Sequence, residues 1–188
     1  VEGVAAPYQM TASSNLSSSR ALRDVTEQYG GEYFAAAVGE VNVTTKMKEC
    51  GALIGGEGNG GVIYPALHYG RDAMVGVALF LTNLAYKKIN VSELLKTYPQ
   101  YVIAKNKIEL SDSALIDRIL DEVKTVFAAE DINTIDGVKI SFESRKEWVH
   151  LRRSNTEPII RIYAEASTKE AADALAQQII DIANKIIG

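Results

Sequence analysis

The spacing of apolar residues divides the chain into two series of predicted elements. In the first half, short runs that are apolar throughout alternate with stretches of helical spacing. Continuous apolar runs are typical of strands that are covered on both faces, as in a parallel sheet. The pattern therefore predicts an α/β unit with helices at 19–29, 41–50 and 73–88 and strands at 33–38 and 52–54.

Residues at the ends of these elements support the pattern. Gly30 and Gly31 follow the first helix, at a position where the left-handed conformation favours glycine. Asp72 suits the electropositive start of the third helix. The side chains expected to be buried on that helix are Val77, Phe80, Leu81 and Leu84. Asn90 and Glu93 predict a capping box on a short helix that ends before Pro99, which places a domain boundary between residues 98 and 99.

The second half predicts an antiparallel sheet covered by two helices on one face. Strands are expected at 101–110, 138–142, 147–151 and 159–166, and helices at 114–127 and 169–187, the latter opened by a capping box from Ser167 to Glu170. The other face of this sheet is too polar for a core, and we expect it to face a cleft. Its side chains are Trp148, His150, Arg152, Arg161 and Tyr163.

Composition limits the classes of function. The 188 residues suit two compact units of about 100 residues each. No run of about 18 apolar residues predicts a membrane span, and no secretory signal opens the sequence. The single cysteine, Cys50, cannot form an internal disulfide, which fits a cytoplasmic protein, and neither histidine has a cluster of metal ligands near it in sequence. A net charge of −4 disfavours nucleic acid as the main partner, whereas arginines clustered between 145 and 161 suit a small anion.

The turn at 152–158 between two predicted strands is a candidate anion site. Arg152 ends the strand before it and Arg161 lies just beyond it. A guanidinium presents a planar fork of donors to a phosphate, and short hydroxyl and amide side chains can supply the remaining hydrogen bonds. The candidate phosphate ligands are Arg152, Ser154, Asn155, Thr156 and Arg161. An ordinary polar hairpin tip remains the alternative on composition alone.

A second candidate is the glycine-rich run at 55–61. Gly56, Gly58 and Gly61 formally satisfy the dinucleotide-binding pattern G-x-G-x-x-G, but a β-prone segment and Pro65 follow where that pattern requires a helix. No Gly-Lys-Ser/Thr is present for a P-loop. The remaining alternative from the residues alone is a flexible glycine hairpin with Glu57 in solvent.

Both runs resemble loops of the α-D-phosphohexomutases. The sequence from Arg152 to Pro158 resembles the family's phosphate-binding loop, and Gly56-Glu57-Gly58-Asn59-Gly60 resembles its Gly-Glu-x-Ser-Gly sugar loop, with Asn59 at the serine position. The resemblance implies sugar contacts by Glu57 and Asn59, with His68 and Arg71 shaping the mouth beside them. Thr11-Ala12-Ser13 imitates the family's catalytic phosphoserine loop but lacks its histidine and proline, so we interpret Ser13 as a decoy.

The resemblance implies the third and fourth domains of such an enzyme. The expected fold is a mixed αβα-sandwich domain, residues 1–98, which is expected to lack part of its N-terminal end, followed by a smaller TBP-like domain, residues 99–188. The family interconverts hexose 1-phosphate and hexose 6-phosphate through a hexose 1,6-bisphosphate. Its phosphoserine and Mg²⁺ loop lie in the first two domains, so the resemblance implies that this fragment is inactive by itself and needs those domains as partners. It also implies that the fragment binds phosphohexose and interacts with neither nucleic acid nor membrane. The alternatives are a free-standing phosphometabolite-binding module and, more remotely, a nucleic-acid module; the sequence does not distinguish glucose, mannose and glucosamine as the hexose.

Overall fold

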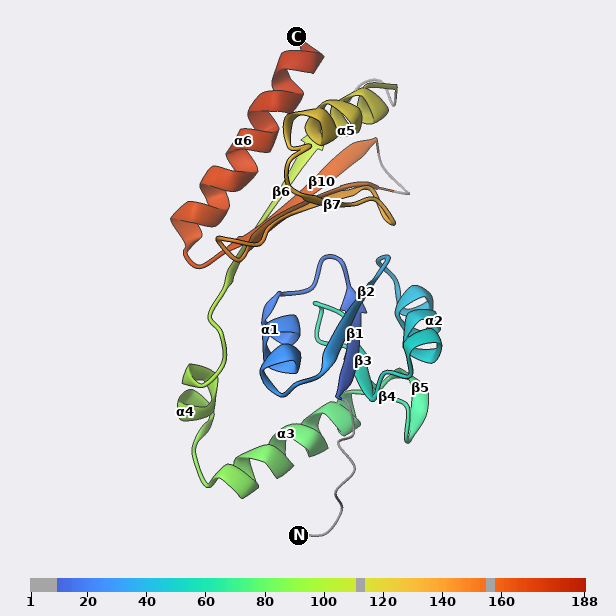
Figure 1. Cartoon of the computed structure of the whole chain (residues 1–188), viewed down its shortest axis with the longest axis vertical. Coiled ribbons are helices and arrows are strands. Elements are labelled where there is room, and N and C mark those ends of the chain that lie inside the picture. Colours follow the sequence, from blue (N-terminus) through green and yellow to red (C-terminus); the bar gives the residue numbers. More distant parts are fainter. Residues whose placement is uncertain (1–9, 111–113, 155–157) are drawn as a thin grey trace. The chain divides into compact units, whose positions relative to one another are not determined.

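The structure, a computed structural model, describes residues 10–110, 114–154 and 158–188. The chain divides into two compact units, Val1–Gln100 and Tyr101–Gly188 (Figure 1). Each unit has its own sheet and its own cluster of buried apolar side chains. No helix in the described ranges has the length and apolarity that a membrane crossing requires.

The first unit is built on a mixed five-stranded sheet with the order β2-β1-β3-β4-β5. Strand β1 (Thr11–Asn15) pairs in parallel with β2 (Glu32–Ala36) and with β3 (Ile54–Gly56). Strands β4 (Val62–Tyr64) and β5 (His68–Arg71) extend the sheet in antiparallel fashion. The expected α/β architecture is confirmed, although β3 begins two residues later than predicted and β5 was not predicted.

Strand β1 was also missed, because its sequence is polar. All five of its residues are nevertheless buried, and Ser13 is 0% exposed. The Ser14 hydroxyl lies 2.8 Å from the Tyr33 hydroxyl, which satisfies one of these buried groups. Hydrophobic periodicity does not detect a strand whose buried side chains are small and polar.

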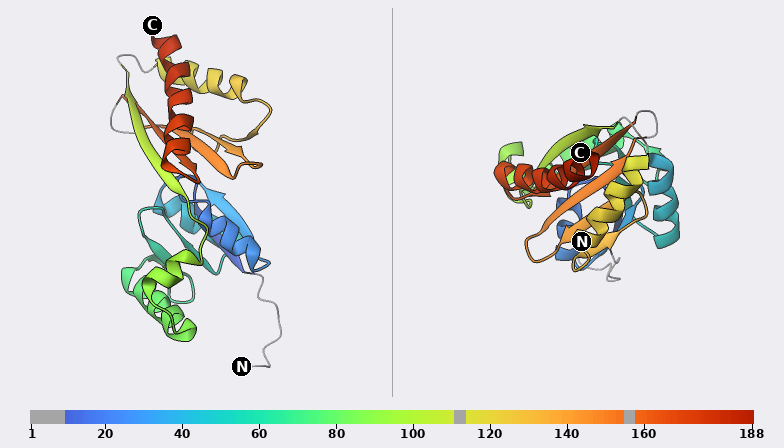
Figure 2. Two further views of the ribbon diagram at one scale, coloured as in Figure 1. Left: turned by 90° about the vertical axis from the view of Figure 1, so that its left-hand side faces the viewer. Right: turned by 90° about the horizontal axis from the view of Figure 1, so that it is seen from above.

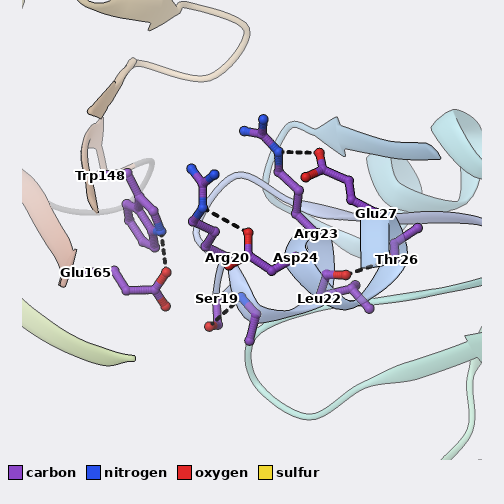
Figure 3. A network of polar contacts seen from close by, with 10 residues as sticks. Ser19, Arg20, Leu22, Arg23, Asp24, Thr26, Glu27, Trp148 and Glu165 are labelled. Atoms are coloured by element: carbon purple, nitrogen blue, oxygen red, sulfur yellow. Dashed lines mark hydrogen bonds and ion pairs between the residues drawn. The ribbon is translucent and has the colours of Figure 1, made fainter. Parts of the chain in front are cut away.

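Two helices cover opposite faces of this sheet (Figure 1). Helix α1 (Ala21–Gln28) packs on β1 and β2, and α2 (Glu40–Cys50) packs on the three parallel strands. Val43 and Met47 of α2 are fully buried, and a Cβ on Gly55 of β3 would lie 2.4 Å from the Met47 sulfur. Glycine at 55 therefore lets the helix approach the sheet. Ion pairs four residues apart line α1, such as Arg23 with Glu27 (Figure 3).

Helix α3 (Ala73–Lys87) forms where predicted, but its buried stripe was predicted wrongly. Asp72 caps it by accepting a hydrogen bond from the Val75 N–H at 3.0 Å, as expected. Val77, Phe80 and Leu81 are 41–56% exposed, and no residue of this helix is buried. The reason is that α3 packs on β4 through Gly76, where a Cβ would lie 3.1 Å from the Val62 side chain, while its apolar stripe points elsewhere. Helix α4 (Val91–Lys96) carries the predicted capping box between Asn90 and Glu93.

The second unit is an antiparallel sheet with two helices on one face (Figures 1 and 2), as the sequence predicts. Its strands, in the order β6-β10-β9-β8-β7, are β6 (Val102–Glu109), β7 (Asp131–Asn133), β8 (Val138–Phe142), β9 (Glu147–Arg153) and β10 (Ile159–Ala166). Helices α5 (Ala114–Val126) and α6 (Lys169–Ile187) pack on each other, and α6 packs on β6 and β10. The apolar stripes of both helices and the inward-facing strand residues form the larger core.

Strand β7 was not predicted from the sequence, and two further details of this unit differ from the sequence predictions. Helix α6 has the predicted bounds, but its N-cap is Thr168 and not Ser167. The Thr168 hydroxyl accepts a hydrogen bond from the Ala171 N–H at 3.2 Å. On the polar face of the sheet, Trp148 and His150 are each only 2% exposed. The Trp148 indole N–H donates to Glu165 at 2.7 Å (Figure 3), and the Lys139 ammonium lies 4.0 Å from the Trp148 ring centroid. Polar partners therefore make burial of these large side chains possible on a face without an apolar core.

Candidate functional site

The glycine-rich run at 55–61 forms a tight turn between β3 and β4. The Glu57 N–H donates to the Gly61 carbonyl and the Gly60 N–H donates to the Glu57 carbonyl, both at 3.0 Å. Gly60 has a φ of +92°, and a Cβ on Gly56 would lie 2.2 Å from the Gly61 carbonyl oxygen. Gly56 and Gly60 are thus required by the turn itself, which presents Glu57 in one defined place.

The Glu57 side chain is not a solvated hairpin tip. It is 6% exposed, and each of its carboxylate oxygens has a polar partner from a different element, one through a hydrogen bond and one through an ion pair. The Asn15 amide, at the end of β1, donates to Oε1 at 3.1 Å, and the Arg71 guanidinium, at the end of β5, lies 3.3 Å from Oε2. The alternative of a flexible glycine hairpin with Glu57 in solvent is therefore excluded.

The Asn15 amide is oriented by its own neighbours. Its Oδ1 accepts from the Ser17 N–H at 3.1 Å and from the Ser18 hydroxyl at 3.0 Å. Since both of these groups donate, the oxygen must face them, and the NH₂ group must face Glu57. Sequence reasoning missed Asn15, which gave no signal beyond its place in a polar segment.

Arg71 is also held from a second side. Its Nε lies 2.8 Å from Glu40 Oε2, and its backbone N–H donates to Glu40 Oε1 at 3.1 Å. These bonds, the backbone one first, hold the pKa of Glu40 below its ordinary value. The Arg71 side chain crosses Gly61 so closely that a Cβ there would lie 2.4 Å from Arg71 Cδ. Arg71 is therefore fixed between two carboxylates, and Glu40 is a member of the cluster that sequence reasoning missed.

Three of the four residues predicted around the sugar line two neighbouring hollows, and the fourth, His68, contacts Asp72 at the edge of one of them. An open hollow of about 540 Å³ is lined by Asn59, Arg71 and Glu40, among others, and a neighbouring one of about 280 Å³ is lined by Glu57, Ser18 and Leu22. His68 lines neither of these two hollows. Its Nε2 lies 3.0 Å from Asp72 Oδ2, a carboxylate whose pKa is lowered first by the Val75 N–H and then by His68. His68 thus supports the start of α3.

In the second unit, the described part of the predicted phosphate site consists of Arg152, Ser154 and Arg161. Arg152 and Arg161 are directly opposed across the β9–β10 ladder, and the Ser154 N–H donates to the Ile159 carbonyl at 3.0 Å. Two guanidinium groups in opposed positions repel each other, so this end of the sheet favours an anion. Asn155 and Thr156 lie outside the described residues.

Arg152 forms an ion pair with Asp136, which lies in the hairpin between β7 and β8. Asp136 Oδ2 lies 3.0 Å from Arg152 Nε, an ion pair in which the N–H is not aligned for a hydrogen bond. The Asp136 carbonyl oxygen lies 2.6 Å from Nε2 of His150. Burial lowers the pKa of His150 to about 4, so the ring is neutral at pH 7 and donates this hydrogen bond. Sequence reasoning missed Asp136, because the contact depends on the fold of the hairpin.

The geometry of the hairpin depends on Gly137. This residue has a φ of +73°, and a Cβ on it would lie 2.1 Å from the Leu151 carbonyl oxygen and 3.0 Å from the Arg152 Cα. Only glycine allows the hairpin to approach β9 closely enough for Asp136 to reach Arg152.

Both units match one protein family. Residues 4–101 match phosphoglucomutase/phosphomannomutase, alpha/beta/alpha domain III, and residues 106–182 match phosphoglucomutase/phosphomannomutase, C-terminal domain. The chain belongs to the phosphoglucomutase/phosphomannomutase family. The resemblance seen in the sequence is thereby confirmed.

Individual relatives agree with this membership. A probable phosphoglucosamine mutase from Methanopyrus kandleri is 33% identical over 174 residues, which cover 92% of this chain and 38% of the relative. A phosphoglucomutase/phosphomannomutase family protein from Burkholderia thailandensis has a similar structure, with a TM-score of 0.74 and 25% identity over 94% of this chain and 37% of that one. The chain therefore spans well under half the length of these relatives, which belong to a family of phosphohexomutase isomerases.

Solved structures of the family contain ligands. One structure of N-acetylphosphoglucosamine mutase from Aspergillus fumigatus contains glucose 1,6-bisphosphate; it has a TM-score of 0.66 and 15% identity over 95% of this chain and 39% of that one. Another contains GlcNAc-6P and magnesium, with a TM-score of 0.65 and 14% identity over 96% of this chain and 39% of that one. In the described ranges of the present chain, no group of three or more His, Cys, Asp or Glu side chains could hold a metal ion.

Proposed function

We propose that this chain is the substrate-holding C-terminal part of a phosphohexomutase that interconverts hexose 1-phosphate and hexose 6-phosphate. The observation that carries the proposal is the Glu57 carboxylate, which the glycine turn presents and which a hydrogen bond from Asn15 and an ion pair with Arg71 hold in one orientation. Family membership supplies the reaction class, because the relatives are mutases that act on phosphosugars.

Glu57 accepts hydrogen bonds from sugar hydroxyls. A carboxylate has about four lone-pair sites, so the hydrogen bond from Asn15 and the ion pair with Arg71 leave room for two hydroxyl donors. Hydroxyls on adjacent carbons of a hexose lie far enough apart to reach the two oxygens of one carboxylate. Asn59, which lines the neighbouring hollow, offers a donor and an acceptor to the same sugar. His68 and Arg71 act at the rim, Arg71 through its bond to Glu57.

The second unit holds the phosphate that is not reacting. Because Nε of Arg152 faces Asp136, its terminal NH₂ groups would bind the phosphate, together with Ser154 and Arg161. Asn155 and Thr156 complete the proposed loop. Holding the sugar and the distant phosphate at once places the other phosphate for in-line transfer, and this positioning is the contribution of the chain to catalysis.

The reaction itself requires the additional length that the relatives possess. The family resemblance assigns the phosphoserine and the Mg²⁺ loop to the first two domains, and Ser13 is buried inside β1. We propose that the chain by itself binds phosphohexose without converting it, with hexose 1,6-bisphosphate as the intermediate of the complete enzyme.

The test is mutase kinetics of the full-length enzyme with Glu57→Gln. This change keeps the shape of the side chain and removes its charge, so the proposal expects kcat/KM to fall by about 30- to 1000-fold, equivalent to about 2 to 4 kcal/mol of transition-state stabilisation. The matched control is Glu49→Gln on the exposed face of α2, which should leave kcat/KM within about twofold. Wild-type kinetics for the Glu57 variant would refute the sugar contact.

A further inference from the structure

We propose that Asn15 and Arg71 are positioning residues that orient the Glu57 carboxylate for sugar hydroxyls, and that glycine at position 61 is required for Arg71 to do so. The inference rests on the proposed function of Glu57 and names the residues that prepare it. Neither residue needs to touch the sugar.

Asn15 holds one oxygen of Glu57 from a rigid base. It ends the interior strand β1, is 5% exposed, and pairs in register with Ala36 of β2. Its amide is fixed by the Ser17 and Ser18 donors, so its NH₂ group can point only toward Glu57. A short side chain on an interior strand loses little entropy when it makes such a bond, which suits a positioning role.

Arg71 holds the other oxygen without neutralising the site. Its guanidinium is shared between Glu57 and Glu40, so two carboxylates face one positive charge. Glu40 also accepts from the Arg71 backbone N–H, which fixes the direction in which the arginine leaves β5. Because the cluster keeps a net negative charge, Glu57 remains a strong acceptor for hydroxyl groups.

Gly61 makes this arrangement possible. A Cβ at position 61 would lie 2.4 Å from Cδ and 2.9 Å from Cγ of Arg71, so any side chain there would displace the arginine stem. Gly61 has no positive φ, so its backbone does not require glycine. Steric room for Arg71 is therefore the reason for glycine at this position.

The first experiment is a double-mutant cycle in the full-length enzyme with Asn15→Asp and Glu57→Gln. Asn15→Asp keeps the oxygen that Ser17 and Ser18 bind but places a second carboxylate against Glu57, and we expect kcat/KM to fall about tenfold or more. In the double variant the pair is exchanged, since the amide introduced at position 57 can donate to the carboxylate introduced at position 15. Adding Asn15→Asp to Glu57→Gln should therefore cost less than about twofold.

Controls separate positioning from folding. Asn42→Asp, the same chemical change at an exposed position of α2, should leave kcat/KM within about twofold. Thermal unfolding of each variant, monitored by circular dichroism, should match wild type within a few degrees. If the effects of Asn15→Asp and Glu57→Gln multiply, or if Asn15→Asp behaves like Asn42→Asp, the inference is overturned while the proposed function stands. If Glu57→Gln itself has no effect, the proposed function fails first.

The second experiment tests Gly61. Gly61→Ala should lower kcat/KM about tenfold in the wild-type background and less than about twofold in an Arg71→Ala background, because its only effect is to move Arg71. Equal losses in both backgrounds would show that Gly61 acts on the turn itself and would overturn this part of the inference.

Discussion

At the scale of single residues, the site depends on charged groups that are held by other charged groups. Arg71 lies between Glu40 and Glu57, and Arg152 lies against Asp136. In each case an arginine is oriented by a carboxylate from a different element, which reduces the freedom it would lose on binding a ligand. Residue type alone identified the arginines, but the fold identified their partners.

Arg152→Lys should weaken phosphate binding although it keeps the charge. A lysine ammonium cannot make the planar two-point contact of a guanidinium. For the wild-type chain we expect a dissociation constant for inorganic phosphate of about 1 mM, or about −4 kcal/mol, because Arg152 and Arg161 are only partly buried and a phosphate beside them would stay largely solvated. Amide NMR titration measures it, and Arg153→Lys, on the opposite face of β9, is the control. Shifts confined to Arg71 or α6 would contradict the assignment.

His150 should make the second unit sensitive to acid. Its pKa is lowered by burial from an ordinary value of 6.5 to about 4, so the folded state binds its proton less readily than the unfolded state. The contribution of His150 to the free energy of unfolding is fully present above about pH 6.5 and is lost as the pH falls toward 4. At about 1.4 kcal/mol per pH unit, the total loss is about 3 kcal/mol. Urea unfolding followed by Trp148 fluorescence should show this loss between pH 7 and 4.

The His150→Gln variant isolates that contribution, because other carboxyl groups also titrate in this range. Its unfolding free energy should depend less steeply on pH than that of wild type between pH 6.5 and 4. Identical pH profiles for the two proteins would contradict the burial of a neutral His150.

At the scale of elements, close approach of backbone segments matters as much as apolar packing. Gly55 lets α2 reach the sheet, and Gly137 lets the β7–β8 hairpin reach β9. Strand β1 is buried throughout although it is polar, whereas the apolar helix α3 has no buried residue. Hydrophobic character alone therefore does not locate the interior of the first unit.

Gly137→Ala should be far more destabilising than Gly30→Ala. Both glycines have φ near +74°, so both substitutions incur the left-handed penalty of about 1 kcal/mol. At Gly30 a Cβ meets nothing within 4 Å, whereas at Gly137 it would lie 2.1 Å from a backbone oxygen. We expect a loss of about 1 kcal/mol for Gly30→Ala and about 3 kcal/mol or more for Gly137→Ala, measured by denaturant unfolding. Equal losses would mean that the hairpin relaxes without cost.

At the scale of the whole molecule, the chain contains two compact units that match two domains of a longer enzyme family. It spans 38% of the Methanopyrus relative and 37% of the Burkholderia structure. Each unit supplies one proposed binding site, the first unit for sugar hydroxyls and the second unit for phosphate. The proposed function assigns the phosphoserine that donates the phosphoryl group to the remaining length of the complete enzyme.

The chain alone should therefore show no mutase activity and no phosphate on Ser13. Ser13 is 0% exposed within the interior strand β1, where no phosphosugar can reach its hydroxyl. Incubation with glucose 1,6-bisphosphate followed by intact-mass measurement should show the unmodified mass. A stoichiometric adduct that disappears in Ser13→Ala would make Ser13 the nucleophile and overturn the decoy interpretation.

The sequence by itself determined the order of most elements, the antiparallel second unit and the two candidate loops. Amphipathic spacing, as in α5 and α6, and loop motifs are local properties, so neighbouring residues are sufficient to predict them. Tertiary structure alone decided that β1 is buried, that α3 is not, and that Asn15 and Arg71 meet Glu57. Asn15 is 42 positions from Glu57, and Glu40 is 31 positions from Arg71. Such contacts depend on which strands pair and on where glycine allows close approach, and no local periodicity encodes either.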